Sequence, residues 1–165
     1  MTEHLKTILT AQFEASLAML RECIARCPAE QWEAKIAKYT FWQVAYHTLC
    51  FADLYLTASE EAFVCRDLHP QGMEELNGEY PSRRFSQEEL LRYADICREK
   101  VRESIAAETR ETLEGPSGFP RHHVSRAEMH IYNIRHIQHH AGQLSALLRR
   151  IEVDTRWVRS GWPSA

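Results

Sequence analysis

Apolar side chains recur at steps of three and four residues in four segments of the chain, residues 3–27, 40–63, 86–113 and 125–151. Such spacing places the apolar residues on one face of an α-helix. The first segment carries the pattern with Leu5, Ile8, Leu9, Phe13, Leu17, Leu20 and Ile24. Every proline lies outside these segments, as expected for a residue that interrupts a helix. The pattern therefore predicts four long amphipathic helices.

Three of the predicted helices begin at residues that suit a helix start. Ser86 and Ser125 are each followed three residues later by a glutamate, Glu89 and Glu128. In this capping box each side chain accepts a hydrogen bond from the other residue's backbone N–H. Thr40 is a good N-cap for the second helix. These residues place the starts of the second, third and fourth helices.

The remaining pattern defines the fold class that we expect. Strand-like alternation and internal repeats are not apparent in the sequence. We therefore predict an all-α four-helix bundle in which residues 1–165 form a single domain. One long loop, residues 64–85, joins the second and third helices, and such long connections are usually functional or disordered. Trp157 and Trp162 in the tail suit a bundle end, a dimer interface or a pocket mouth.

Composition and charge exclude two classes of partner. The chain has 165 residues, of which 44% are apolar and 26% charged, and its net charge is −3. A domain of this size buries roughly 70% of its unfolded surface, so it needs no metal to fold. Lysine and arginine form no cluster of the kind that binds phosphates, which argues against nucleic acid. No run approaches the roughly 20 apolar residues that cross a bilayer, so we expect no membrane partner.

The cysteines and the first residues of the chain indicate the cytoplasm. The five cysteines are odd in number and lack the spacing of a disulfide framework, so reduced thiols are the simplest interpretation. They are Cys23, Cys27, Cys50, Cys65 and Cys97. Cys23 and Cys27 share a helix face, where small buried side chains are the favoured reading and a metal or oxidant site the alternative. Glu3 and Glu14 among the first apolar residues favour an amphipathic helix over a signal peptide.

Three histidines on two predicted helices suggest a metal site. His136 and His140 are four residues apart, so both imidazoles can reach the same ion. Neutral imidazole binds divalent Zn, Ni, Co or Fe, and two such ligands need a third from elsewhere. His47 lies among apolar neighbours, where an unpaired ring costs a few kcal/mol to bury and metal ligation removes that cost. The alternative for each histidine is a hydrogen-bonded core residue.

Residues beside the histidine pair have narrower expected roles. His139 is expected to support a ligand or to lie at the surface. Gln143 lies seven residues after His136, so it faces the same side and can bond a ligand or a bound water, or be solvated. Gly142 costs about 1 kcal/mol relative to alanine inside a helix, and close packing of a neighbouring helix is the expected reason.

These residues resemble the DinB-like superfamily. The resemblance lies in Trp42 placed five residues before His47, and in the HxxHHxGQ element that begins at His136. It implies a four-helix bundle, often a homodimer, with His47, His136 and His140 holding a metal at the end of a pocket. Characterised relatives include transferases and isomerases that use low-molecular-weight thiols, and metal-dependent hydrolases. The family name refers to damage induction and does not imply DNA binding.

The leading hypothesis is a metal-dependent enzyme that acts on a small molecule, either a thiol-dependent transferase or a hydrolase. A three-histidine site with an open position can acidify a bound water or a thiol. Gln43, Tyr132 and Asn133 are candidate proton carriers. Asp53 points about 120° away from His47, which leaves no evident general base and favours thiol chemistry. The alternatives are a non-catalytic, stress-related module that binds metal or a small ligand, and an interaction protein with structural histidines.

Overall fold

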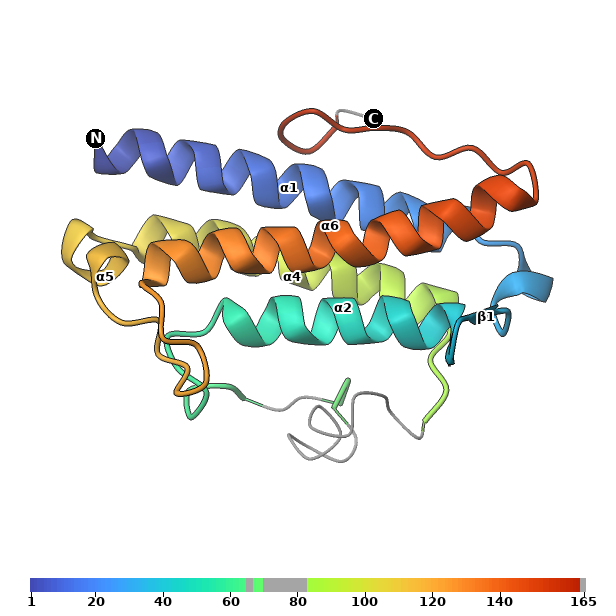
Figure 1. Ribbon diagram of the computed structural model, residues 1–165, viewed down its shortest axis with the longest axis horizontal. Coiled ribbons are helices and arrows are strands. Elements are labelled where there is room, and N and C mark those ends of the chain that lie inside the picture. Colours follow the sequence, from blue (N-terminus) through green and yellow to red (C-terminus); the bar gives the residue numbers. More distant parts are fainter. Residues whose placement is uncertain (65–66, 70–82, 164–165) are drawn as a thin grey trace.

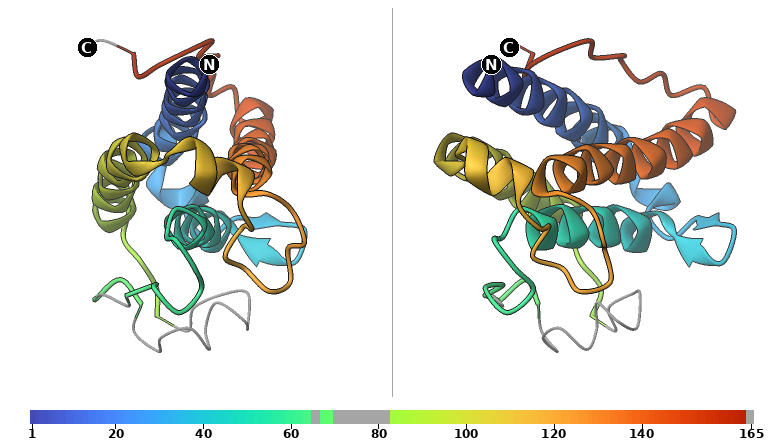
Figure 2. Two further views of the ribbon diagram at one scale, coloured as in Figure 1. Left: turned by 90° about the vertical axis from the view of Figure 1, so that its left-hand side faces the viewer. Right: turned by 60° about the vertical axis from the view of Figure 1, so that its left-hand side comes forward.

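Four long helices form a bundle in the computed structural model, which describes residues 1–64, 67–69 and 83–163. The helices are α1 (Thr2–Arg26), α2 (Phe41–Tyr55), α4 (Gln87–Ala107) and α6 (Arg126–Arg150). α1 and α6 run in one direction and α2 and α4 in the other, as Figures 1 and 2 show. α1 and α2 each pack against both α4 and α6, so α1 and α2 lie on opposite corners of the bundle. The predicted all-α four-helix bundle is confirmed.

The core lies between the four helices and is closely packed with apolar and aromatic side chains. Phe13 and Leu17 of α1, Leu49 of α2 and Leu144 of α6 have no exposed surface. Burying a side chain of this kind contributes roughly 1.5–3 kcal/mol. The bundle is therefore stabilised by apolar burial, without need of a bound ion.

A short hairpin that the sequence pattern did not reveal precedes α2. The 3₁₀ turn η1 (Ala29–Gln31) leads into strands β1 (Lys35–Ile36) and β2 (Tyr39–Thr40), which pair antiparallel. Two residues per strand are too few for an alternating pattern to be recognised. The hairpin delivers Thr40 to the start of α2, where Thr40 and Gln43 form a capping box.

The capping predictions are confirmed at all three helix starts, including Thr40. Ser86 accepts a hydrogen bond from the N–H of Glu89, and Ser125 accepts one from the N–H of Glu128. In turn, the carboxylate of each glutamate accepts a hydrogen bond from the backbone N–H of its serine. Each box satisfies two backbone donors that a helix start otherwise leaves without a partner.

The second helix is shorter than predicted: it ends at Tyr55 and not near residue 63. Arg126 at the start of α6 donates to the carbonyl oxygens of Tyr55, at 3.1 Å, and Leu56, at 3.2 Å. The hydroxyl of Thr57 donates to the carbonyl of Leu54. These donors take up the last carbonyls of the helix, so the following residues turn away.

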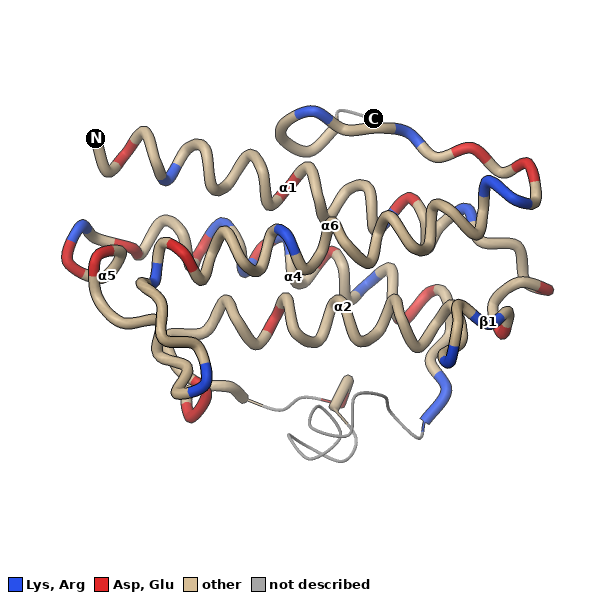
Figure 3. Tube along the Cα trace, in the orientation of Figure 1, with Lys and Arg blue, Asp and Glu red and all other residues tan. Residues whose placement is uncertain are grey.

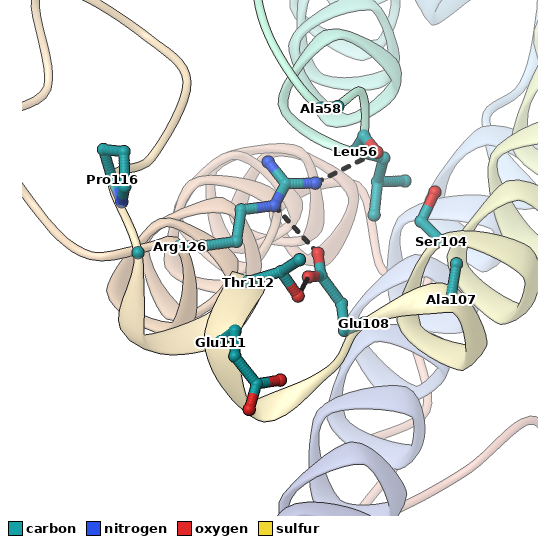
Figure 4. Close-up of a pocket in the computed structure, with 10 residues that line it drawn as sticks. Leu56, Ala58, Ser104, Ala107, Glu108, Glu111, Thr112, Pro116 and Arg126 are labelled. Atoms are coloured by element: carbon teal, nitrogen blue, oxygen red, sulfur yellow. Dashed lines mark hydrogen bonds and ion pairs between the residues drawn. The ribbon is translucent and has the colours of Figure 1, made fainter.

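The third predicted helix, residues 86–113, is interrupted at Glu108. α4 ends at Ala107, Glu108 has an extended backbone with ψ 138°, and the short helix α5 (Arg110–Glu114) follows after Thr109 as its N-cap. The carboxylate of Glu108 accepts hydrogen bonds from Arg126 Nε at 2.9 Å and His130 Nε2 at 2.8 Å. Figure 4 shows the contact between Glu108 and Arg126. The helix breaks at Glu108, whose side chain turns inward and binds α6.

Part of the long connection is anchored to the bundle. Residues 65–66 and 70–82 of the predicted 64–85 loop, with Cys65, lie outside the described residues. The hydroxyl of Tyr46 donates to the carbonyl of Leu68 at 2.8 Å. The buried ring of His69 places Nε2 2.8 Å from the hydroxyl of Tyr93. Residues 67–69 are therefore held against α2 and α4.

The C-terminal tail lies along α1 (Figure 1). The N–H of Gly161 donates to the carbonyl of Ala11 at 2.9 Å, and the N–H of Trp162 donates to Glu14 at 3.2 Å. The guanidinium of Arg98 from α4 lies 4.3 Å from the centre of the Trp162 ring. Trp157 is 73% exposed. Trp162 therefore lies on the flank of α1 and α4, which is none of the three places considered for the tryptophans.

Acidic and basic residues lie close together on two of the four helices. Figure 3 shows positions of both signs interspersed along α1 and α4, whereas α6 has Glu128 as its one acidic residue among four arginines. Among the residues that the structure describes, no helix combines the length and the apolar character needed to cross a membrane.

Gly142 gives the first testable prediction, because the expected close packing at this position is wrong. Gly142 is exposed within α6, and a Cβ added there would meet no atom within 4 Å. We expect Gly142→Ala to raise the free energy of unfolding by about 0.5–1 kcal/mol, since alanine has the higher helix propensity. Urea denaturation measures the change.

Gly118 provides the matched control for this substitution. Its φ is 84°, and an added Cβ would lie 2.0 Å from the carbonyl oxygen of Ala58. Gly118→Ala is therefore expected to lower stability in the same assay. A Gly142→Ala protein that is no more stable than wild type would contradict the prediction.

Candidate metal centre

Three histidine rings meet where α2 packs against α6. His47 Nε2 lies 3.3 Å from His136 Nε2. The ring centre of His140 is 5.0 Å from that of His47 and 4.7 Å from that of His136. One ligand atom from each residue lies within 4.8 Å of the other two. The antiparallel helices thus bring together the three residues singled out in the sequence, whose role as metal ligands stays a prediction.

The separation of the rings fits a divalent ion. Two nitrogens bound to one tetrahedral ion at about 2.0–2.1 Å lie about 3.3 Å apart. The Nε2 atoms of His47 and His136 have that separation, 3.3 Å. The same distance also fits a hydrogen bond between the two rings, in which one ring donates. Geometry alone is therefore compatible with both metal binding and a structural histidine pair.

Burial keeps the rings of His136 and His140 in the neutral form that metals bind. Burial, followed by the neighbouring imidazoles of His140 and His47, lowers the pKa of His136 to about 2. Burial also lowers the pKa of His140, although its bond to Gln143 opposes the shift. Both rings are therefore neutral at neutral pH and carry a nitrogen lone pair. Metal ligation requires this neutral form.

Gln143 contacts one of the three rings directly. Its Oε1 lies 2.9 Å from His140 Nδ1, and its Nε2 lies 3.3 Å from Nε2 of the exposed His139. Of the roles considered for Gln143, the structure shows the hydrogen bond to a candidate ligand, the ring of His140. His139 lies at the surface beside it, outside the three-ring cluster.

Two of the three candidate proton carriers are engaged elsewhere. Gln43 accepts hydrogen bonds from the N–H and the hydroxyl of Thr40 as part of the helix cap. Asn133 is buried and donates to the carbonyl of Ala52 at 3.1 Å. Neither side chain is therefore placed to exchange protons with a substrate.

Asp53 is also directed away from the cluster, as its position on the helix predicted. Its buried carboxylate accepts a hydrogen bond from Tyr93 at 3.0 Å and pairs with the ammonium of Lys100. Both partners belong to α4, on the opposite side of α2 from α6. Among the described residues, no carboxylate joins the three-histidine group.

A row of aromatic rings, not recognised in the sequence, extends from the cluster. This aromatic wall consists of Phe51, Tyr55, Tyr132 and His122. Phe51 lies 5.8 Å from the ring of His136, Tyr55 lies 5.6 Å from Tyr132, and His122 lies 5.0 Å from Tyr132. Phe51 and Tyr55 follow His47 by four and eight residues, a helical spacing that could have identified them.

Tyr132 is the third candidate proton carrier. It is 38% exposed, whereas Tyr55 beside it is almost fully buried. Burial, and next the neighbouring phenol of Tyr132, raises the pKa of Tyr55, so this hydroxyl stays protonated. Tyr132 lies one turn before His136 on α6 and within reach of solvent. Unlike the amides of Gln43 and Asn133, its side chain is held neither in a helix cap nor on a buried carbonyl, and it interacts with the hydroxyl of Tyr55.

Two cavities lie at the end of the bundle where α4, α5 and α6 meet. One, of about 600 Å³, is lined by residues that include Glu108, Thr112 and Arg126 (Figure 4). The other, of about 710 Å³, is lined by residues 114–120, residues 122–125 and Glu128. None of the three clustered histidines lines either cavity.

Cys23 of α1 and Cys27, which caps its end, have the burial expected of small core side chains. Cys23 and Cys27 are both buried free thiols. Burial raises the pKa of each to about 12, so neither is a thiolate at neutral pH. Because the thiolate is the reactive form, this burial favours the interpretation of both residues as small buried side chains.

The fold and the cluster define an all-α bundle with three histidines from two antiparallel helices. Comparison with protein families gives a match to the DinB superfamily over residues 12–144. The match covers most of the chain and includes His47, His136 and His140, so the chain belongs to the DinB superfamily. No curated protein and no solved structure matches it.

Proposed function

We propose that this DinB-superfamily protein is a metal-dependent enzyme that acts on a small molecule. His47, His136 and His140 would hold one divalent transition metal, such as Zn, Ni or Fe. The observation that carries the proposal is the convergence of three half-buried imidazoles, with Nε2 of His47 and His136 3.3 Å apart. A bound metal supplies Lewis-acid activation of a water or a thiol. Imidazole suits several divalent ions, so the ligand set does not select one.

The residues around the cluster favour thiol transfer over hydrolysis. Hydrolysis needs a general base near the attacking water. Asp53 pairs with Lys100 on the far side of α2, and no other described carboxylate joins the cluster. A thiol that is acidified by a metal needs no such base. Tyr132 is the side chain placed to hold or deliver a proton, and a low-molecular-weight thiol is the proposed co-substrate.

A second candidate is a non-catalytic, stress-related protein that binds metal or a small ligand. The lack of a described general base beside the cluster favours it, because binding requires no proton transfer. A fourth protein ligand that closes the coordination shell would support this candidate. An exchangeable water or anion in that position would support the enzyme.

The first test is the metal content of the untagged protein. We expect about one equivalent of a divalent transition metal in the wild type and less than about a tenth in His47→Ala, which lacks one of three ligands. Elemental analysis gives both values. His4→Ala is the matched control, because His4 is exposed at the start of α1. Loss of metal in the control, or none in the wild type, would contradict the proposal.

The second readout is turnover by the metal-loaded protein. Bacillithiol, mycothiol and glutathione are each supplied with monochlorobimane as the electrophile. Conjugation above the rate of the His47→Ala protein is expected with one of these thiols. A protein that binds metal but produces no conjugate with any of them would favour the non-catalytic candidate.

The proposal also includes the cytoplasm as the location and a homodimer as the assembly. The four described cysteines are free, which fits a reducing compartment. The homodimer follows from the family resemblance. Light scattering of the purified protein measures the assembly directly.

A further inference from the structure

One of the three clustered rings is tied to a side-chain amide through its second nitrogen. Gln143 lies three residues after His140 on α6, so the two side chains share a face. Oε1 of Gln143 is 2.9 Å from Nδ1 of His140. Nε2 of the same amide is 3.3 Å from Nε2 of His139. The amide thus bridges two adjacent histidines, only one of which belongs to the cluster.

This bridge determines which nitrogen of His140 carries the proton. A carbonyl oxygen only accepts hydrogen bonds, so Nδ1 of His140 must donate to Oε1 and therefore carries the hydrogen. Nε2 of His140 is then left with the lone pair that a metal requires. With the amide reversed, its NH₂ would donate to Nδ1, and the hydrogen of the neutral ring would move to Nε2. That tautomer cannot bind a metal through Nε2.

The other end of the Gln143 amide contacts His139. The NH₂ of Gln143 lies 3.3 Å from Nε2 of His139 and, since an amide NH₂ only donates, this nitrogen accepts. His139 is exposed and lies outside the cluster, so both ends of the amide are hydrogen-bonded in the orientation that leaves Oε1 to His140.

His136, the other clustered histidine on α6, has no such hydrogen bond at its Nδ1 among the described residues. Nδ1 of His136 is buried and has no hydrogen-bond partner among the described residues. A hydrogen on that atom is therefore not stabilised by a protein acceptor. Of the two clustered histidines on α6, His140 is therefore the one with a side-chain hydrogen bond that sets its tautomer.

We infer that Gln143 is a positioning residue that holds His140 in its metal-binding tautomer. The inference rests on the proposed function, because it assigns Gln143 to the same site. Groups that orient a metal-binding imidazole typically change metal affinity by about 10–100-fold when removed. The effect is expected on metal binding and on the proton position, and not on the fold.

The test compares Gln143→Met, which removes the acceptor at similar size, with Gln143→Glu, which keeps an acceptor. Competition with a chelator measures the dissociation constant for Zn²⁺. We expect it to rise about 10–100-fold in Gln143→Met and to stay within about threefold in Gln143→Glu. Gln138→Met is the matched control. Gln138 lies on the same helix but contacts Met19 of α1, and no change is expected.

A second measurement does not depend on metal. The ¹⁵N shifts of the His140 ring in metal-free protein report which nitrogen carries the hydrogen. We expect the Nδ1–H form in the wild type and a mixture in Gln143→Met. Unchanged affinity together with an unchanged tautomer in Gln143→Met would overturn the inference. A wild type that binds no Zn²⁺ would instead overturn the proposed function, while the ring shifts would still decide the role of Gln143.

Discussion

Glu108→Ala is expected to lower the free energy of unfolding by about 3–5 kcal/mol, because it leaves a buried guanidinium without its counter-charge. The side chains of Glu108 and Arg126 are 8% and 6% exposed, and Arg126 Nε lies 2.9 Å from the carboxylate. His130, fully buried, donates to the same oxygen at 2.8 Å. Arg126 also holds the end of α2 through the carbonyl of Leu56. One substitution therefore disturbs the contacts of α4, α6 and α2 together.

Urea denaturation at neutral pH measures this loss, and Glu111→Ala is the matched control. Glu111 lines the same cavity as Glu108 but is exposed, so its replacement should leave the free energy of unfolding nearly unchanged. A loss below about 1 kcal/mol in Glu108→Ala would indicate that the buried pair contributes no more than a surface pair.

The same carboxylate gives the wild type a defined acid sensitivity. Burial raises the pKa of Glu108, but hydrogen bonds from His130, Thr112 and Arg126 outweigh it and lower the pKa to about 2. A carboxyl whose pKa is lower in the folded than in the unfolded state stabilises the fold above its unfolded pKa, about 4.3. That stability is lost as the pH falls from there towards about 2. The stability of Glu108→Ala should depend less on pH over this window.

His136→Leu is expected to separate metal binding from folding. In the metal-free protein we expect stability that is unchanged or up to about 1 kcal/mol higher, since the substitution removes a buried ring whose Nδ1 lacks a described partner. Metal at 100 times its dissociation constant stabilises a protein by about 2.7 kcal/mol, and the variant should lose that gain. Thermal unfolding with and without Zn²⁺ measures both effects.

The control for this substitution is His123→Leu, at an exposed position in the connection before α6. It should retain the metal-dependent shift in melting temperature. A His136→Leu protein that is still stabilised by Zn²⁺ would show that the ion binds elsewhere. A metal-free His136→Leu protein several kcal/mol less stable than wild type would instead favour a structural role for the bond between His136 and His47.

The elements that depend on local sequence could be predicted. The helical period located the four long helices, and the serine–glutamate pairs located two of their starts. The spacing of His136 and His140, and the apolar setting of His47, identified the three rings that the fold brings together. In each case the signal lies within a few residues, where helix geometry alone fixes which side chains share a face.

The elements that depend on distant residues could not be predicted from the sequence. α2 ends at Tyr55 because Arg126, 71 residues later, binds its last carbonyls. α4 breaks at Glu108 because that carboxylate turns towards α6. The aromatic wall draws on α2, α6 and the connection between α5 and α6, and its member from the connection, His122, follows no helical spacing from the clustered histidines. The direction of the Gln143 amide depends on hydrogen bonds that only coordinates reveal.

The parallel course of α2 and α4 dictates how much chain must join them. A helix of 15 residues such as α2 is about 22 Å long, so the return path to the start of α4 needs at least about seven extended residues. The chain between Tyr55 and Gln87 has several times that number. Topology alone thus explains a minimal crossover, and part of the additional length, residues 67–69, covers the neighbouring faces of the two helices that it joins.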